Sequence, residues 1–330
     1  MPFNAVWGQP QAVDFLRRAV SQGRAAHAYL FSGPEGVGKR TTALALAQAL
    51  NCLQPQAGDA CGECAACRKI AAAGHPDVVL LEPEGQALKI DQVRETLQRN
   101  LRWKPLEGRC KAFILDEADA LTTEAANSLL KALEEPPDAV VIVLITSQPF
   151  ALLPTIRSRC QEVRFRPLDT GLLAQWLSEQ HGLPSETAAS LARLSDGRPA
   201  EALRLSDPEV QALRSQVLEV AAAAQPEAWP ELAAAMSEWQ GAAVEPLVFL
   251  LTWFRDLLVL ASGVSPRLAV NQDRLAQLRA ALSGKTPETL WDQCRLVLQA
   301  LDWKSQNLNL QLLLERMWMK LLPRTGAGAR

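Results

Sequence analysis

A glycine-rich segment near the N-terminus constrains the fold of this chain more than any other feature. Residues 33–39 read Gly-Pro-Glu-Gly-Val-Gly-Lys, and they follow a short apolar run at 28–32 and open an Ala/Leu-rich stretch at 39–50. A strand, a glycine loop and a helix in this order predict a phosphate loop, whose backbone N–H groups converge on phosphate oxygens. The glycines of this loop are Gly33, Gly36 and Gly38. Lys39 would reach the outer phosphates, so the segment predicts a site for ATP or ADP.

The residue after Lys39 departs from the pattern of an active phosphate loop. A Ser or Thr hydroxyl is expected there as a magnesium ligand, but this chain has Arg40. Thr41 follows, although it lies about 100° further round the helix and is not expected to point the same way. Two interpretations therefore stay open, a nucleotide-binding loop and a loop that only turns the chain.

An acidic pair follows a second apolar run. Residues 113–117 read Phe-Ile-Leu-Asp-Glu, the pattern of a Walker B motif. Asp116 is predicted to bind magnesium through water, and Glu117 to polarise an attacking water molecule. Such a pair is common after strands, but together with the phosphate loop it indicates a P-loop ATPase fold. Fold and hydrolytic activity are separate predictions.

The first half of the chain alternates strand-like and helical segments. Helices are predicted at 91–101 and 122–135, the second of which stops before two prolines. Strands separated by helices favour a parallel sheet covered on both faces, so the predicted class is α/β. After residue 167 only helices are predicted. The five predicted strands are 28–32, 78–81, 112–116, 140–146 and 162–165.

Four cysteines lie close together in an otherwise polar segment. Their spacing, C-x8-C-x2-C-x2-C, allows four thiolates to surround one zinc ion with no open position for catalysis. A structural Zn²⁺ site is therefore predicted. Its ligands would be Cys52, Cys61, Cys64 and Cys67.

Composition limits the classes of partner. The formal net charge is −2, so no global basic field indicates nucleic-acid binding, and any DNA contact must come from a local patch or a partner. No leader pattern or apolar run of membrane-spanning length is present, which favours a cytoplasmic location.

Two further motifs resemble those of a known family. Residues 128–137 read Ser-Leu-Leu-Lys-Ala-Leu-Glu-Glu-Pro-Pro, which is similar to the LLK-x-LEEPP segment of AAA+ clamp-loader subunits of bacterial DNA polymerase III. Residues 155–160 end in Ser-Arg-Cys, the SRC motif of the same family, which also shares the cysteine module. The resemblance covers about residues 5–205.

The resemblance implies a division into three domains. Residues 1–166 would form the AAA+ P-loop domain with the zinc module at 52–67. Residues 167–207 would form a three-helix lid, and 208–330 an all-α collar that mediates oligomerisation.

The resemblance also implies partners and site residues. The family assembles a hetero-pentamer with gamma/tau and delta subunits, which loads a sliding clamp on primed DNA. Arg159 of the SRC motif would act as an arginine finger in the ATP site of a neighbouring gamma/tau subunit. Thr146 matches the position of the family's phosphate sensor, although a buried Thr at a strand end is an equally good interpretation.

Two kinds of subunit carry these motifs, a stator and the catalytic gamma/tau ATPase. Arg40 favours the stator, with weak or absent ATP hydrolysis of its own. So does Ala200, which stands where the lid of an active ATPase carries an arginine, unless Arg198 substitutes for it. The catalytic gamma/tau-type ATPase remains the alternative.

Overall fold

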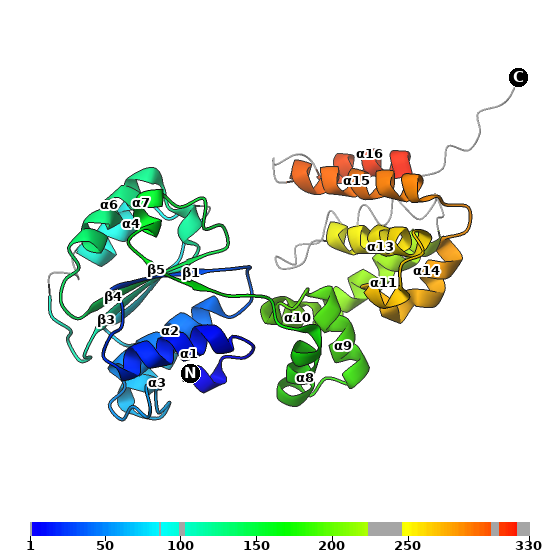
Figure 1. The fold of residues 1–330 in the computed structure, drawn as a ribbon. Coiled ribbons are helices and arrows are strands. Elements are labelled where there is room, and N and C mark those ends of the chain that lie inside the picture. The colour runs from blue at the N-terminus through cyan, green and yellow to red at the C-terminus, as the bar shows by residue number, and fades with distance from the viewer. Residues whose placement is uncertain (1, 86, 99–102, 224–245, 305–309, 322–330) are drawn as a thin grey trace, which may run out of the picture. The chain divides into compact units, whose positions relative to one another are not determined.

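The computed structural model describes residues 2–85, 87–98, 103–223, 246–304 and 310–321. A five-stranded sheet in the order β2-β3-β4-β1-β5 organises the N-terminal part (Figure 1). Every pair of neighbouring strands is parallel, as the alternation of strands and helices predicts. The strands are β1 (Ala28–Ser32), β2 (Val78–Leu81), β3 (Lys111–Leu115), β4 (Val140–Thr146) and β5 (Gln161–Arg164).

Helices cover both faces of this sheet, which explains why its central strands are apolar throughout. Along β4, Val141, Val143 and Ile145 pack with α1 and α2, whereas Ile142 and Leu144 pack on the opposite face with α4, α6 and α7. Successive side chains of a strand point to opposite faces, so two hydrophobic cores sandwich the sheet. These helices are α1 (Pro10–Ser21), α2 (Lys39–Asn51), α4 (Ile90–Val93), α6 (Thr123–Glu134) and α7 (Pro154–Arg157).

The predicted helix at 91–101 is present over the described residues 90–98, but it is not a regular α-helix throughout. The α-helix α4 ends at Val93 and continues as a π-helical turn, η2 (Arg94–Gln98), while positions 99–101 lie outside the described residues. Apolar residues four apart fit either hydrogen-bond pattern, so periodicity could not distinguish them. Two predicted strands are also displaced by one residue, since β3 begins at Lys111 and β5 at Gln161.

The predicted helix at 122–135 is present and begins with an N-cap. The Thr122 hydroxyl accepts a hydrogen bond from the backbone N–H of Ala125, at 3.2 Å. Such a cap satisfies one of the N–H groups that a helix leaves without a partner in its first turn. Short helices complete this part of the fold: η1 (Phe3–Ala5), α3 (Ala65–Ala71) and η3 (Ala118–Ala120).

The chain folds into two compact units, residues 1–176 with 196–200 and residues 177–195 with 201–330. In the second unit α13 packs against α11, α14 and α15 around the buried Trp253. The division into domains at 166 and 207 stays a prediction. The helices that follow the sheet are α8 (Thr170–His181), α9 (Ser185–Leu194), α10 (Pro199–Leu205), α11 (Pro208–Ala223), α13 (Pro246–Ala261), α14 (Leu275–Ala281), α15 (Pro287–Lys304) and α16 (Leu310–Leu321), with the 3-10 turns η5 (Pro266–Leu268) and η6 (Gln272–Arg274).

Among the helices that the structure describes, none combines the length and the apolar character that crossing a bilayer requires.

Candidate nucleotide and metal sites

The carboxyl ends of the three central strands bring the predicted phosphate-site residues to one edge of the sheet. Ser32 at the end of β1 pairs with Thr146 at the end of β4, and Leu115 at the end of β3 pairs with Leu144. The glycine loop after β1 and the acids after β3 therefore emerge at the same edge. Ligands of open α/β sheets bind at this edge, because the loops that leave the strands form a crevice there.

The glycine loop has the backbone that a phosphate cradle needs. Gly38 precedes α2 with a φ of +96°, a left-handed conformation that residues with a Cβ rarely adopt. At Gly33 a Cβ would lie 2.3 Å from the carbonyl oxygen of Phe165. The backbone N–H of Ala200 also donates to the carbonyl of Gly36, at 3.2 Å. The start of α10 is thus joined directly to the loop.

Lys39 is almost fully buried beneath this loop. Its ammonium group donates hydrogen bonds to the carbonyl oxygens of Gly33 and Pro34, the second at 2.6 Å. Burial lowers the pKa of Lys39, and the nearby carboxylates of Asp116, Glu35 and Asp119 oppose this change. The ammonium group thus contacts the loop itself, and its role in phosphate binding stays a prediction.

The guanidinium of Arg40 occupies the space beside the Walker B acid. Its Nη1 forms an ion pair with Glu82 and lies 3.7 Å from Oδ2 of Asp116. Burial raises the pKa of Asp116, while the N–H of Glu117 and the charge of Arg40 oppose the increase. A magnesium ion bound to Asp116 through a water molecule would lie roughly 4 Å from the carboxylate of Asp116. The Nη1 atom of Arg40 already lies at about this distance. The residues present therefore do not fit magnesium at this position.

Two other predicted nucleotide-site residues, Glu117 and Thr41, lie on different elements at this end of the sheet. Glu117 follows Asp116 in a left-handed conformation, with a φ of +49°, and burial and the charge of Asp116 raise its pKa. Thr41 is half-buried in the first turn of α2, and the hydroxyl of Thr42, one residue on, donates to the carbonyl of Gly38. The nucleotide-binding role of Thr41 and Glu117 stays a prediction.

Two acids at this edge were missed by the sequence interpretation. The buried hydroxyl of Thr146 donates to Asp119, which also accepts the backbone N–H of Ser147 at 3.3 Å. Asp119 therefore orients the predicted sensor, and Glu82 orients Arg40. Glu82 directly follows β2, so its place after a strand was a signal that could have been used.

Arg159 lies just beyond α7, at the surface of the first unit. Its Nη2 forms an ion pair with Glu134 at 2.9 Å, and its Nη1 donates to the carbonyl of Thr155 at 2.9 Å. The side chain of Arg159 is 36% exposed and that of Glu134 is 49% exposed. The LLK-x-LEEPP and SRC motifs, which are separate in the sequence, thus meet through this pair.

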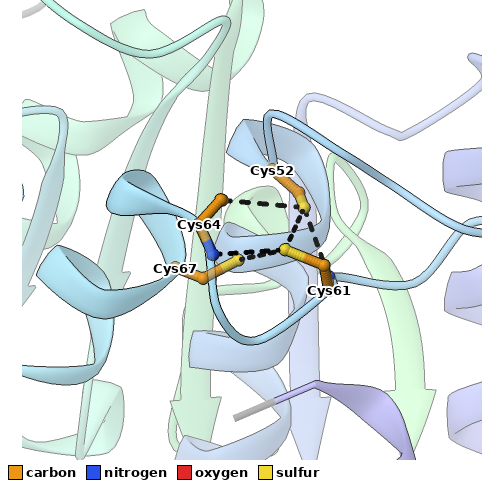
Figure 2. A group of neighbouring side chains, drawn as sticks. All are labelled: Cys52, Cys61, Cys64 and Cys67. Atoms are coloured by element: carbon orange, nitrogen blue, oxygen red, sulfur yellow. Dashed lines mark hydrogen bonds between the residues drawn. The ribbon is translucent and has the colours of Figure 1, made fainter.

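The four predicted metal ligands converge on one point (Figure 2). Their ligand atoms all lie within 4.8 Å of one another, and the closest contacts between sulfur atoms are 3.5 and 4.0 Å. Four sulfurs at about 2.3 Å from a central zinc would lie about 3.8 Å apart in a tetrahedron. The cluster therefore has the dimensions of a four-thiolate metal site. Cys52 directly follows α2, Cys61 lies in the connecting loop, Cys64 precedes α3, and Cys67 lies within α3.

Hydrogen bonds favour the thiolate form at two of the four cysteines, Cys61 and Cys64. The N–H of Cys64 donates to the sulfur of Cys61, and hydrogen bonds from backbone N–H groups lower the pKa of Cys61. Burial would raise the pKa of Cys64, but hydrogen bonds from the backbone and from neighbouring thiols outweigh it and lower that pKa to about 6. Burial raises the pKa of Cys52 and that of Cys67, so these two thiols would lose their protons as a metal binds. Two thiolates and two thiols that a metal can deprotonate form a donor set that fits a metal ion.

Fold and site together define the class of this protein. A parallel sheet in this order, with a phosphate loop after β1 and an acid pair after β3, is the AAA+ type of P-loop domain. The family model described as DNA polymerase III, delta subunit matches residues 8–169, and the model described as DNA polymerase III, delta subunit, C terminal matches 208–321. The chain belongs to the family of delta' subunits of the DNA polymerase III clamp loader.

Similar proteins support this membership along nearly the whole chain. DNA polymerase III subunit delta' of Bacillus subtilis is 33% identical over 95% of this chain and 96% of the relative. The delta' subunit of Pseudomonas aeruginosa is 39% identical over 70% of each chain. DNA polymerase III subunit tau of Escherichia coli is 36% identical, but over 65% of this chain and only 34% of the relative. The partial gamma/tau matches do not favour the catalytic alternative.

Proposed function

We propose that this delta' chain is a stator, which supplies Arg159 to the ATP site of an adjacent gamma/tau subunit and hydrolyses little or no ATP itself. The observation that carries this proposal is the position of Arg40. Its guanidinium stands beside Asp116, where an active P-loop ATPase holds magnesium. The chain thus shares the fold of the gamma/tau ATPase but lacks a place for the magnesium ion that ATP hydrolysis requires.

The contacts of Arg159 suit a role in a neighbouring site. Ion pairs between exposed side chains contribute only about 0–1 kcal/mol, so the pair with Glu134 is easily exchanged for a stronger partner. A phosphoryl group is such a partner, because its charge is higher and its oxygens match the planar fork of a guanidinium. The hydrogen bond to Thr155 meanwhile supports the side chain at the surface.

The cysteine module is proposed to hold structural zinc. Four thiolates leave no open coordination position, so the metal would stabilise the fold without taking part in catalysis. The module joins the end of α2 to α3, and α2 begins at the phosphate loop. Metal binding would therefore stabilise the helix that carries Lys39 and Arg40.

The partners follow from the family. We propose assembly with gamma/tau and delta subunits into a hetero-pentamer that contacts the sliding clamp and primed DNA, in the cytoplasm. The support is the match of the chain to delta' subunits over nearly its full length.

A reconstituted loader tests the role of Arg159. Loader that contains Arg159→Ala is expected to hydrolyse ATP at least about tenfold more slowly in the presence of clamp and primed DNA, since arginine fingers are worth about 10³–10⁵ in rate. Arg159→Lys should not restore the rate, because lysine lacks the fork. Arg164→Ala is the matched control, since Arg164 forms a comparable exposed pair with Glu162 at 3.1 Å.

A variant of the partner acid separates the finger from a structural role. Glu134→Gln removes the same ion pair but leaves Arg159 in place, so it should retain the loader rate. Equal losses in Glu134→Gln and Arg159→Ala would show that the pair only supports the fold. Robust ATP turnover by the isolated chain, abolished by Lys39→Ala, would overturn the stator assignment.

A further inference from the structure

The cluster of Arg40, Glu82 and Asp116 has a consequence for how this phosphate loop binds its ligand. We propose that the loop binds a nucleoside di- or triphosphate without a divalent cation, with the Arg40 guanidinium serving as the resident positive charge. This inference goes beyond the stator role, which concerns Arg159 and another subunit's site.

The first argument is where the charge of Arg40 lies. Its Nη1 bridges two carboxylates, Glu82 after β2 and Asp116 after β3, at the edge of the sheet where the glycine loop opens. In an active P-loop ATPase a magnesium ion connects the acid after the strand to the phosphates. Here a permanently charged side chain is already bound to that acid.

The second argument is the hydrogen-bonding capacity that remains. A guanidinium has five N–H donors in a fixed plane. Both ion pairs of Arg40 use Nη1, and within the described part of the chain Nε and Nη2 have no hydrogen-bond partner. These two groups form one edge of the fork, the geometry that binds two phosphate oxygens at once.

The third argument is that the rest of the cradle is intact. Gly33 and Gly38 have the backbone of a phosphate loop, and the ammonium of Lys39 is held at the loop by its own carbonyl groups. Within the loop and the first residues of α2, only the position expected to supply the metal-binding hydroxyl differs, and it carries Arg40.

Binding to the purified full-length chain tests the proposal. ATP and ADP are titrated by calorimetry in buffer with excess magnesium and in buffer depleted of divalent cations by a resin. A dissolved chelator is avoided because it would also remove metal from the cysteine module. The dissociation constants for the natural chain are expected to agree within about threefold between the two buffers. Arg40 already supplies the positive charge there, so magnesium should add little to the affinity.

Variants of the loop supply the matched controls. Arg40→Thr restores the hydroxyl, so its affinity should become at least about tenfold tighter with magnesium than without. Arg40→Lys keeps a charge without the fork and should bind more weakly in both buffers, still without a requirement for metal. Lys39→Ala should weaken binding in both buffers. Because Arg40 is a half-exposed residue, its substitutions leave the core intact.

Either of two results would overturn the proposal. One is that the natural chain binds neither nucleotide in either buffer, and the other is that it binds them only with magnesium. The rise in melting temperature caused by ADP, measured without divalent cations, gives a second readout because a ligand of the folded state stabilises it. Arg159→Ala should leave both affinities unchanged, which separates a failure here from a failure of the stator role.

Discussion

At the scale of single residues, Asp77 illustrates a contact that motifs do not predict. Its side chain is buried, and its carboxylate accepts hydrogen bonds from the backbone N–H groups of Leu106, Glu107 and Gly108, at 2.7 to 2.8 Å. Burial would raise the pKa of Asp77, but these three bonds outweigh it and lower the pKa below its ordinary value. The carboxylate therefore anchors the segment that leads into β3 and so to Asp116.

We expect Asp77→Asn to destabilise the chain in a pH-dependent manner. A group with a lowered folded-state pKa stabilises the fold fully above its unfolded pKa, about 3.9, and this contribution is lost as the pH falls through the folded-state pKa. The free energy of unfolding of the variant should be lower by about 1–3 kcal/mol at pH 7. This difference should shrink in acid.

Urea unfolding of both chains between pH 7 and pH 3 measures this effect. Asp14→Asn, at an exposed position on α1, is the matched control and should have little effect at pH 7. A difference between Asp77→Asn and the natural chain that stays constant over this range would contradict the assignment of charge to Asp77.

At the scale of elements, the cysteine module is connected to the neighbouring elements through a small number of specific contacts. Asp59 of its loop forms an ion pair with Arg17 on α1, at 3.2 Å. Asp59 also accepts a hydrogen bond from the backbone N–H of Phe3 in η1, at 2.8 Å. At Gly58 a Cβ would lie 2.4 Å from the carbonyl oxygen of Arg17. Because this segment has so little hydrophobic core, a bound metal would be its main internal support.

Metal removal should therefore lower the melting temperature of the chain. The purified protein is expected to contain one zinc ion, and treatment with a strong chelator should destabilise it because metal binding is coupled to folding. Elemental analysis and thermal unfolding measure the two effects.

The double variant Cys61→Ser, Cys64→Ser should already be destabilised and should no longer respond to the chelator. Cys160→Ser, outside the cluster, should respond as the natural chain does. An unchanged melting temperature after complete loss of metal would refute the structural role.

At the scale of the whole molecule, the second unit depends on a buried polar network between distant segments. Arg214 on α11 forms two hydrogen bonds of 3.0 Å with Asp273 and one of 2.8 Å with Asn271. Asn271 in turn donates to the fully buried Asp256 on α13. The network thus joins α11, α13 and the segment before α14 into one body.

Arg214→Met should destabilise this unit by about 1–3 kcal/mol, because it removes the hydrogen-bond donor of the buried Asn271 and of the partly buried Asp273. Urea unfolding and limited proteolysis of the 201–330 region would detect the loss. Nucleotide affinity and the response to chelator, which depend on the first unit, should remain. Equal loss of all three properties would contradict the division into two units.

Local patterns in the sequence determined much of this protein. The glycine loop, the cysteine spacing and the apolar runs each act over a few residues, so they were sufficient to predict the class of fold, the order of the elements and the metal-capable cluster. The motifs at residues 128–137 and 155–160 additionally indicated the relationship to clamp-loader subunits. These features are visible in the chain because each depends on neighbours within one turn, one strand or one loop.

Only the tertiary structure decided which charges meet. Arg40 reaches Glu82 and Asp116 because the sheet order places the ends of β1, β2 and β3 at one edge, although they are far apart along the chain. Arg159 meets Glu134 for the same kind of reason, through the packing of α6 against α7. The partner of a charged side chain is chosen by distance in space, which sequence spacing does not report.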